Sequence, residues 1–371
     1  MSKPRILLMM QLPPPYHGAA VINSRLVGSK RLNSDFEIDV LPVELAREIE
    51  DVGKPSFRKA MLLLGLIARL FSRLHFRRPS IVLYTIPATG VAFGGAMLLM
   101  AVLRGCRVAH VLQMRSRGIA QTAKRSALHH LACRWAFARA TVILYSPRVL
   151  DDVAQFVKPE QIRYLPDGIP DPIIGTLKKK KGAKTNILFL SHLFESKGTM
   201  VLLEALAILK RQGAKFKASL VGEPADVSRA ALTERITILN LNSEVCYPGS
   251  AYGAQKEALY LAADIFTLPS FYPLEAFPGV LLEAMAYGLP IVATDHAAIP
   301  DIVIHDRTGY IVPPRNAASL ADALLSLISD PQLRQKMGKA AREEFKNRYL
   351  FSRYEDRLAT ILQECVQKSL S

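Results

Sequence analysis

Two glutamates frame a turn that could hold a phosphate. Glu275 and Glu283 are separated by seven residues. The pattern around them predicts a strand that ends at Leu268, a loop rich in Pro and aromatic residues, and a helix from about Gly279 to Gly288. The free N–H groups and partial positive charge of a helix N-terminus suit an anion. One carboxylate on each side could then bind hydroxyls, as the ribose and the sugar of a nucleoside diphosphate sugar require. Two glutamates at this spacing are a weak signal alone, and the surrounding Phe-Pro-Gly and Glu-Ala-Met-Ala strengthen it.

Strand-like and helix-like stretches alternate along the whole chain. Runs of Val, Ile and Leu predict buried parallel strands over 5–10, 81–84, 107–112, 141–145, 186–190, 218–221, 265–268 and 290–294. Helices are predicted between and after them, for example over 199–212, 255–262, 280–287 and 317–329. This order predicts an α/β protein with doubly wound domains.

Length and charge divide the chain into two different halves. The 371 residues predict two domains, and an apolar content of 50% with 22% charged residues predicts sizeable cores. The whole net charge of +16 lies in residues 1–181, which have 28 Lys and Arg against 12 Asp and Glu; residues 182–371 have 20 of each. Between Asp51 and Asp151 there is no acidic residue and there are 16 basic ones. A protein that coats nucleic acid would be uniformly basic, so we expect no nucleic-acid partner and one half that faces another anion.

The domain boundary is predicted within 166–184, where Pro, Gly and four consecutive lysines separate two strand patterns. We expect a first domain over 1–170, a linker over 171–184 and a second domain over 185–345. The charged, helical C-terminal stretch predicts a helix over 346–371 that could cross back to the first domain. The lysine run is interpreted as a solvated linker.

Several classes of protein are excluded by the remaining patterns. Four cysteines stand far apart, at 106, 133, 246 and 365, so neither a disulfide framework nor a zinc site is predicted. The longest apolar runs, 60–68 and 91–103, are shorter than the roughly 18–20 residues that span a bilayer. No G-x-S-x-G, H-E-x-x-H or phosphate-loop motif is present. No D-x-D ends a strand, which disfavours a metal-dependent, single-domain transferase, and no metal site is predicted.

The segment around the two glutamates resembles a known family. It reads EAFPGVLLE and then AMAYGLPIVATD. This resembles the E-x7-E signature of the retaining glycosyltransferases of family 4 (glycosyl transferases group 1). NILFLSHLFESKG, VCYPG, AADIFTLPS and TGYIV resemble further family motifs in the same order, as do PPPYHGAA and YLPDGIP nearer the N-terminus. The resemblance is tight over 186–314 and loose before 166. It implies the GT-B fold, in which two Rossmann-like domains face each other across a cleft.

The resemblance also implies residue roles. Glu275 would contact the transferred sugar, Glu283 the ribose, and Lys197 the diphosphate, where a lysine beside a glycine after a strand is physically sensible. The other implied donor-binding residues are Gly18, Ser191, His192, Pro248, Phe277, Pro278, Gly279 and Val280. Backbone amides around 277–280 would bind the distal phosphate.

Two positions depart from the family pattern. His192 stands where an arginine is usual; it cannot make a bidentate contact, so phosphate binding is weaker unless Arg115 or Arg117 compensates. Gln113 stands near the place of a family histidine, and it can hydrogen-bond a sugar hydroxyl but cannot take a proton. It is retained as a candidate catalytic residue with Glu275 and Lys197. His110, three residues earlier, is expected on the opposite face of the strand as an ordinary packed histidine.

The basic half contains a conspicuous helix-like stretch, SFRKAMLLLGLIARLFSRLHFRR, over 56–78. At 100° per residue, five cations fall within one arc of about 100°: Arg58, Lys59, Arg69, Arg73 and Arg77. A mostly apolar helix with a basic stripe is typical of a helix that lies at a membrane interface. The alternative is a helix packed on the first sheet with arginines at its solvent edge. The anionic counterpart would be lipid headgroups, the pyrophosphate of a lipid-linked acceptor, or both, with Arg115 and Arg117 in the same set.

The sequence thus predicts a metal-independent, retaining hexosyltransferase. Its substrate would be a UDP- or GDP-sugar, with no further cofactor, and its acceptor a glycan or lipid-linked glycan of bacterial surface polysaccharide synthesis. We expect a cytoplasmic protein bound peripherally to the inner face of the membrane. The family implies that a donor phosphate oxygen takes the acceptor's proton. Two alternatives stay open: a nucleotide-sugar epimerase on the same fold, and a non-catalytic member that binds the nucleotide without turnover.

Overall fold

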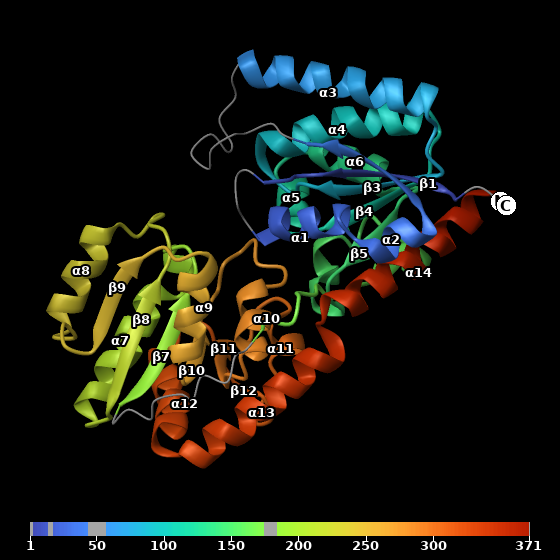
Figure 1. Cartoon of the computed structure of the whole chain (residues 1–371). Coiled ribbons are helices and arrows are strands. Elements are labelled where there is room, and N and C mark those ends of the chain that lie inside the picture. Colours follow the sequence, from blue (N-terminus) through green and yellow to red (C-terminus); the bar gives the residue numbers. More distant parts are fainter. Residues whose placement is uncertain (1–2, 14–17, 44–56, 174–183, 371) are drawn as a thin grey trace. The chain divides into compact units, whose positions relative to one another are not determined.

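The computed structural model describes residues 3–13, 18–43, 57–173 and 184–370. Chain contacts divide the protein into two compact units (Figure 1). The first unit comprises Met1–Asp167 with Phe351–Ser371, and the second comprises Gly168–Leu350. The first predicted boundary, at residue 170, lies three residues from this division.

The first unit is built on a six-stranded parallel sheet with the strand order β2-β1-β3-β4-β5-β6. Its strands are β1 (Arg5–Met10), β2 (Glu37–Pro42), β3 (Ile81–Ile86), β4 (His110–Met114), β5 (Thr141–Leu144) and β6 (Ile162–Tyr164). Strand β1 is buried from Ile6 to Met10, as expected for a parallel strand that is covered on both faces. The order reverses between β1 and β3, so the loops that follow these two strands run to opposite faces.

Helices cover both faces of the first sheet (Figure 1). They are α1 (Gly18–Val27), α2 (Lys30–Asp35), α3 (Phe57–Phe76), α4 (Gly90–Gly105), α5 (Ile119–Lys124), α6 (Ala127–Phe137) and α14 (Phe351–Leu370), with 3-10 turns η2 (Pro147–Asp152) and η3 (Pro159–Gln161). Helices α3, α4 and α6 lie on one face, and α1, α2 and α14 lie on the other.

The second unit has its own six-stranded parallel sheet, in the order β12-β11-β10-β7-β8-β9. Its strands are β7 (Thr185–Leu190), β8 (Phe216–Val221), β9 (Val245–Gly249), β10 (Ile265–Leu268), β11 (Ile291–Thr294) and β12 (Gly309–Val312). This is the strand order of dinucleotide-binding folds, with the reversal between β7 and β10. A ligand in such a sheet binds at the carboxyl ends of the strands beside the reversal.

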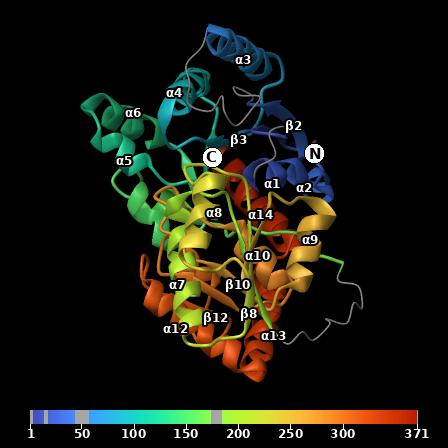
Figure 2. The same ribbon diagram turned by 90° about the vertical axis from the view of Figure 1, so that its left-hand side faces the viewer.

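The helices of the second unit follow its strands in turn. They are η4 (Glu195–Lys197), α7 (Thr199–Arg211), α8 (Arg229–Ile238), α9 (Gly253–Ala262), α10 (Gly279–Ala286), α11 (Ile299–Ile302), α12 (Ala317–Ser329) and α13 (Pro331–Arg348). Figure 2 shows α7 and α12 on one side of the sheet and α9 on the other. The prediction of an α/β protein with two doubly wound sheets is confirmed.

The C-terminal helical stretch is two helices, and they belong to different units. Helix α13 lies in the second unit, and α14 packs in the first through Tyr354, Leu358 and Leu362, which are buried. The Arg31 guanidinium donates to Asp356 at 2.8 Å. The expected return of the last helix to the first domain therefore describes α14.

One predicted strand is shifted along the chain. A strand was expected over 107–112, whereas β4 runs from His110 to Met114. The reason is local: Arg107 has a left-handed φ of 52° and ends the turn after α4. Gln113 consequently lies inside the strand and not after it.

Candidate active site

The reversal in the second sheet brings together two loops that are far apart in sequence. Lys197 lies in η4, after β7, and Glu275 lies in the loop after β10. Because β7 and β10 are neighbours, these loops meet at the carboxyl edge of the sheet. The Lys197 Nζ lies 2.6 Å from Glu275 Oε2, and only 15% and 8% of the two side chains are exposed. The two residues that the resemblance assigns to the diphosphate and the sugar therefore form a largely buried ion pair.

Glycine makes the close approach of these loops possible. Gly198 follows Lys197 with a φ of +86°, and a Cβ there would stand 2.2 Å from the carbonyl oxygen of Pro269. Any other residue would push the Lys197 turn away from the loop that carries Glu275. The serine–lysine–glycine sequence thus has a steric basis in addition to its charge.

A shell of hydroxyl and aromatic groups surrounds the ion pair. The Ser270 hydroxyl donates to the same oxygen, Glu275 Oε2, at 3.1 Å. The ring of Tyr272 lies 4.6 Å from Lys197 Nζ and stacks on Phe194 at 5.5 Å. Burial, and then the carboxylate of Glu275, raise the pKa of the Tyr272 hydroxyl. Lys197 is thus held by one carboxylate and one aromatic face, and a phosphate would have to compete with Glu275 for it.

Glu283 occupies a separate polar cluster on α10. Its Oε1 accepts from Lys256 Nζ at 2.7 Å, and its Oε2 accepts from the Tyr260 hydroxyl at 2.8 Å. Tyr260 is buried and stacks on Tyr287 at 5.2 Å. Burial, and then Glu283, raise the pKa of Tyr260 well above its usual value. Sequence reasoning missed Lys256 and Tyr260; their spacing of four residues on one face of a predicted helix was the available signal.

The turn before α10 has the form expected for a phosphate site. Pro278 is the residue before the helix, and Gly279 is its first residue. The proline side chain has no hydrogen-bond acceptor, so the residue before the helix leaves the first amides of α10 without a side-chain cap. Phe277 and Val280 are partly buried against the core of the second unit, which fixes the direction of the turn.

Ser191, His192 and Pro248 lie further along the carboxyl edge. Ser191 follows β7, and its amide donates to Val221 at 3.0 Å, while Pro248 is an exposed residue of β9. The His192 Nε2 lies 3.9 Å from Glu223, and about half of its side chain is exposed. The side chain expected beside the phosphates thus faces a carboxylate, which also accepts from the Tyr252 hydroxyl at 2.8 Å.

In the first unit, the structure gives Gln113 and Arg115 buried partners within that unit. Gln113 is fully buried, and its amide donates to the Tyr354 hydroxyl at 2.9 Å. Arg115 lies 3.2 Å from Asp167 in an ion pair whose side chains are each 5% exposed, and it donates to the Tyr145 hydroxyl at 2.8 Å. These contacts link β4 to α14 and to Asp167. A buried, paired guanidinium presents no charge to a ligand, so the predicted acceptor role of Arg115 is wrong.

Gly18 and Arg117 complete the predicted residues of the first unit. Gly18 is the first residue of α1, and the loop before it, 14–17, lies outside the described residues. Arg117 forms an ion pair with Asp151. The neighbouring Asp152 accepts hydrogen bonds from the amides of Gly118, Ile119 and Ala120 at the start of α5.

Helix α3 packs through one narrow stripe and leaves many of its other side chains exposed. Leu66, Leu70 and Leu74 are buried, one helical turn apart. Large apolar side chains are exposed elsewhere on the same helix: Phe57, Met61, Leu62, Leu64, Phe71 and Phe76. The helix therefore packs on its unit, as the second interpretation expected, and it also presents an apolar surface; contact with a membrane stays a prediction.

The cations of α3 are not equivalent. Arg58, Arg69 and Arg77 are exposed, and Lys59 is half-buried. Arg73 forms an ion pair with Asp39 of β2 and donates to the carbonyl of Val40 at 2.9 Å. Arg73 was predicted to face a membrane; the structure shows that it also holds α3 to the sheet edge, and its membrane role stays a prediction. Among the helices of the described residues, none is long and apolar enough to cross a membrane.

No cluster of three or more His, Cys, Asp or Glu side chains is placed to hold a metal ion within residues 3–13, 18–43, 57–173 and 184–370. Cationic side chains at the carboxyl edge of the second sheet include Lys197 beside Glu275, Arg315 over the ring of Phe271 and Arg229 over the ring of Tyr247.

Comparison with known proteins agrees with this geometry. Residues 176–344 match the family model Glycosyl transferases group 1. Over 191 residues the chain is 32% identical to WcaL of Escherichia coli (strain K12), whose name assigns it provisionally to colanic acid biosynthesis as a glycosyltransferase, covering 50% of this chain and 46% of WcaL. It is 37% identical over 147 residues to the amylovoran biosynthesis glycosyltransferase AmsK of Erwinia amylovora, covering 38% of this chain and 35% of AmsK. The chain thus spans less than half the length of these curated relatives.

Similarity in structure extends over the whole chain. Anabaena Alr3699/HepE, solved in complex with UDP, superposes with a TM-score of 0.74 at 20% identity, covering 97% of this chain and 100% of HepE. An identity this low is informative about the fold alone. Residues 176–344 therefore carry a Glycosyl transferases group 1 domain, within a chain that has the GT-B fold.

Proposed function

We propose that this protein is a retaining hexosyltransferase that uses a UDP- or GDP-sugar and a glycan or lipid-linked glycan acceptor. The observation that carries the proposal is the buried pair of Lys197 and Glu275 at the strand reversal of the second sheet, 2.6 Å apart. A buried ion pair is costly to keep for stability alone, and this one lies where nucleotides bind in such sheets. HepE, whose fold is the same, was solved with UDP.

Different residues of the second unit would bind different parts of the sugar nucleotide. Glu283 on α10 would bind the ribose hydroxyls, with Lys256 and Tyr260 orienting its carboxylate. The first amides of α10 and Lys197 would stabilise the negative charge that develops on the leaving diphosphate. When the diphosphate binds, Lys197 would exchange Glu275 for a phosphate, and the released carboxylate would accept hydrogen bonds from the sugar. The ion pair would thus hold both groups close to their working positions.

The first unit would bind the acceptor and the membrane surface. Six large apolar side chains of α3 are exposed, together with Arg58, Arg69 and Arg77. Exposed apolar residues beside cations are the combination that binds anionic bilayers. We propose peripheral attachment by this surface, which would bring the active site to a lipid-linked acceptor.

Donor binding and turnover test the proposal together. Calorimetry with UDP, GDP and ADP, followed by product analysis of the matching sugar nucleotide with and without a lipid-linked glycan, should show a sugar–acceptor product and no change of the sugar nucleotide alone. The reaction should survive EDTA. Glu275→Gln should bind the bare nucleoside diphosphate at least as tightly as the wild type, because Lys197 is no longer paired with a carboxylate, and it should lose transfer.

The alternatives give different outcomes. An altered sugar nucleotide without acceptor would identify an epimerase, and binding without turnover with any acceptor would identify a non-catalytic member. His192→Arg should tighten diphosphate binding if that side chain can turn from Glu223 to the phosphates. A strict requirement for a divalent cation would contradict the assignment of the diphosphate charge to Lys197 and α10.

A further inference from the structure

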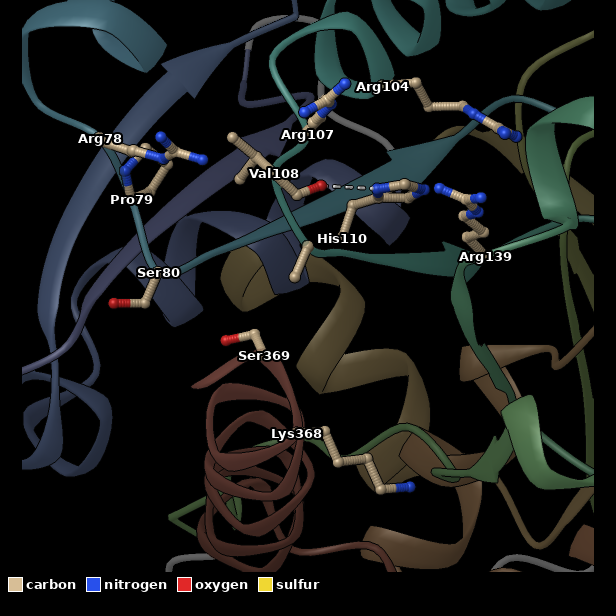
Figure 3. Close-up of a pocket in the computed structure, with 11 residues that line it drawn as sticks. Arg78, Pro79, Ser80, Arg104, Arg107, Val108, His110, Arg139, Lys368 and Ser369 are labelled. Carbon is tan, nitrogen blue, oxygen red and sulfur yellow. Dashed lines mark hydrogen bonds between the residues drawn. The ribbon is translucent and has the colours of Figure 1, made fainter. Parts of the chain in front are cut away.

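A basic pocket lies in the first unit, at the amino-terminal edge of its sheet. Its volume is about 770 Å³. It is formed by the residues before β3, β4 and β5 together with the ends of α4 and α14 (Figure 3). The lining residues are Arg78, Pro79, Ser80, Arg104, Arg107, Val108, Ala109, His110, Arg139, Lys368 and Ser369.

The charge of this pocket is all of one sign. Five of its lining residues are Arg or Lys, and none is Asp or Glu. Helices α4 and α14 end beside the pocket, and each helix carboxyl end offsets about half a positive charge. Those two ends would balance about one cation, so an excess of positive charge from the four arginines remains for a ligand.

The arginines are held in place without carboxylate partners. Arg104 donates to the carbonyl of Trp135 and lies 4.6 Å above its ring. Burial, and then Arg139, lower the pKa of the Arg104 guanidinium, as expected for like charges that face the same space. Arg78, Arg107 and Arg139 form no ion pair with any residue that the structure describes.

His110 supplies a polar atom that has no partner. Its side chain lines the pocket and is only 6% exposed. Its Nδ1 lies 3.0 Å from the carbonyl oxygen of Val108, so that nitrogen carries the proton, and Nε2 is buried without a hydrogen bond (Figure 3). A buried nitrogen of this kind is costly unless a ligand completes it. A protonated phosphate or a ligand hydroxyl could donate to Nε2.

The pocket is separate from the edge at which substrates bind. His110 is the first residue of β4 and Met114 is the last, so the two edges of the sheet are about 13 Å apart along this strand. Ligands of doubly wound sheets bind at the carboxyl edge, and the pocket lies at the opposite one.

We propose that this pocket is a second ligand site, specific for a compound with two or more phosphate groups. Its volume lies in the range of small-molecule sites, and its five cations exceed what one phosphate would neutralise. The phosphates could belong to a soluble compound or to a lipid headgroup, and the chemistry of recognition is the same.

Inorganic tripolyphosphate is a suitable probe, titrated by calorimetry into the full chain. Arg107→Gln with Arg139→Gln removes two exposed, unpaired cations from the pocket and keeps the buried residues, so the fold should be retained. Arg125→Gln with Arg134→Gln is the matched control, because both residues are exposed and belong to the same acid-free stretch without lining the pocket. The pocket variant should bind about 30-fold more weakly than the control, equivalent to about 2 kcal/mol.

Equal affinities for the pocket variant and the control would overturn the proposal, as would the absence of tripolyphosphate binding to the wild type. Sedimentation of both variants with phosphatidylcholine vesicles that contain phosphatidic acid identifies the source. Weaker sedimentation of the pocket variant alone assigns a headgroup phosphate, and equal sedimentation assigns a soluble compound.

Discussion

The ion pair of Lys197 and Glu275 allows a sharp test of how the second unit is built. Lys197→Ala would leave the Glu275 carboxylate only 8% exposed, with Ser270 as its remaining side-chain donor in the structure. Two effects compete. Removing the lysine removes the cost of burying a cation, which stabilises the fold, but it leaves the buried Glu275 carboxylate without its cation, which destabilises the fold. The second should dominate, because Lys197 keeps more contact with water than Glu275 does.

The expected cost follows from the burial. Removing one partner of a fully buried pair costs about 3–5 kcal/mol. Because the Ser270 hydroxyl would still donate to Glu275 at 3.1 Å, we expect a cost at the lower end of that range, about 3 kcal/mol. For a unit of this size, that corresponds to a fall in the midpoint of thermal unfolding of about 6–12 °C.

Differential scanning calorimetry of a small set of variants measures this cost. Lys210→Ala is the control, because Lys210 pairs with Glu244 at 2.9 Å in the same unit, but with 32% of the lysine exposed; its cost should stay below about 1 kcal/mol. Adding Glu275→Gln to Lys197→Ala removes the orphaned charge, and it should restore about 2 kcal/mol.

The reasoning would be refuted if Lys197→Ala cost no more than Lys210→Ala, or if the double variant were less stable than Lys197→Ala. Either result would mean that the Glu275 carboxylate is well solvated without its partner. The loop contact made through Gly198 would then be the main link between the two strand ends.

Other residues of the two units lead to further measurements. Glu283→Ala should weaken binding of the nucleoside and of the nucleoside diphosphate alike, by about 1–3 kcal/mol in calorimetry; a loss confined to the diphosphate would contradict the ribose role. Arg115→Met should lower the free energy of unfolding by about 3 kcal/mol, because the buried Asp167 loses its ion pair with Arg115, and nucleotide affinity should stay unchanged. Reversing the charge of Arg58, Arg69 and Arg77 together should abolish sedimentation with anionic vesicles, at about 1 kcal/mol per cation. Three reversals at exposed cations of the second unit are the control, and undiminished sedimentation would assign membrane contact to another surface.

Local sequence patterns were enough to predict many of the strands and helices of this protein. Buried runs of Val, Ile and Leu predicted most strands, since a parallel strand covered on both faces must be apolar throughout. The helix over 317–329 was predicted with the bounds of α12, because an apolar stripe and a capping Asn316 are local signals. The strand over 107–112 was misplaced, because Arg107 adopts a left-handed φ of 52° that its residue type does not signal.

Contacts between distant residues needed the tertiary structure. Lys197 and Glu275 are 78 residues apart, and they meet only because β10 lies beside β7 and not beside β9. The sequence indicated a basic stripe on α3 but could not show that Arg73 is used by Asp39. It also could not show that α14, from the far end of the chain, supplies the Tyr354 hydroxyl that accepts hydrogen bonds from Gln113 and Arg115.

The sequence by itself determined the alternation of strands and helices and the separation of charge between the two halves, and its motifs singled out the candidate donor-site residues. Each of these depends on neighbours within a few turns or strands. Only the tertiary structure decided which cations are paired, which polar groups are buried, and that five cations from separate loops line one pocket. The physical reason is that strand order and helix docking are settled by packing over the whole unit, and a charge acquires its partner only after that packing is complete.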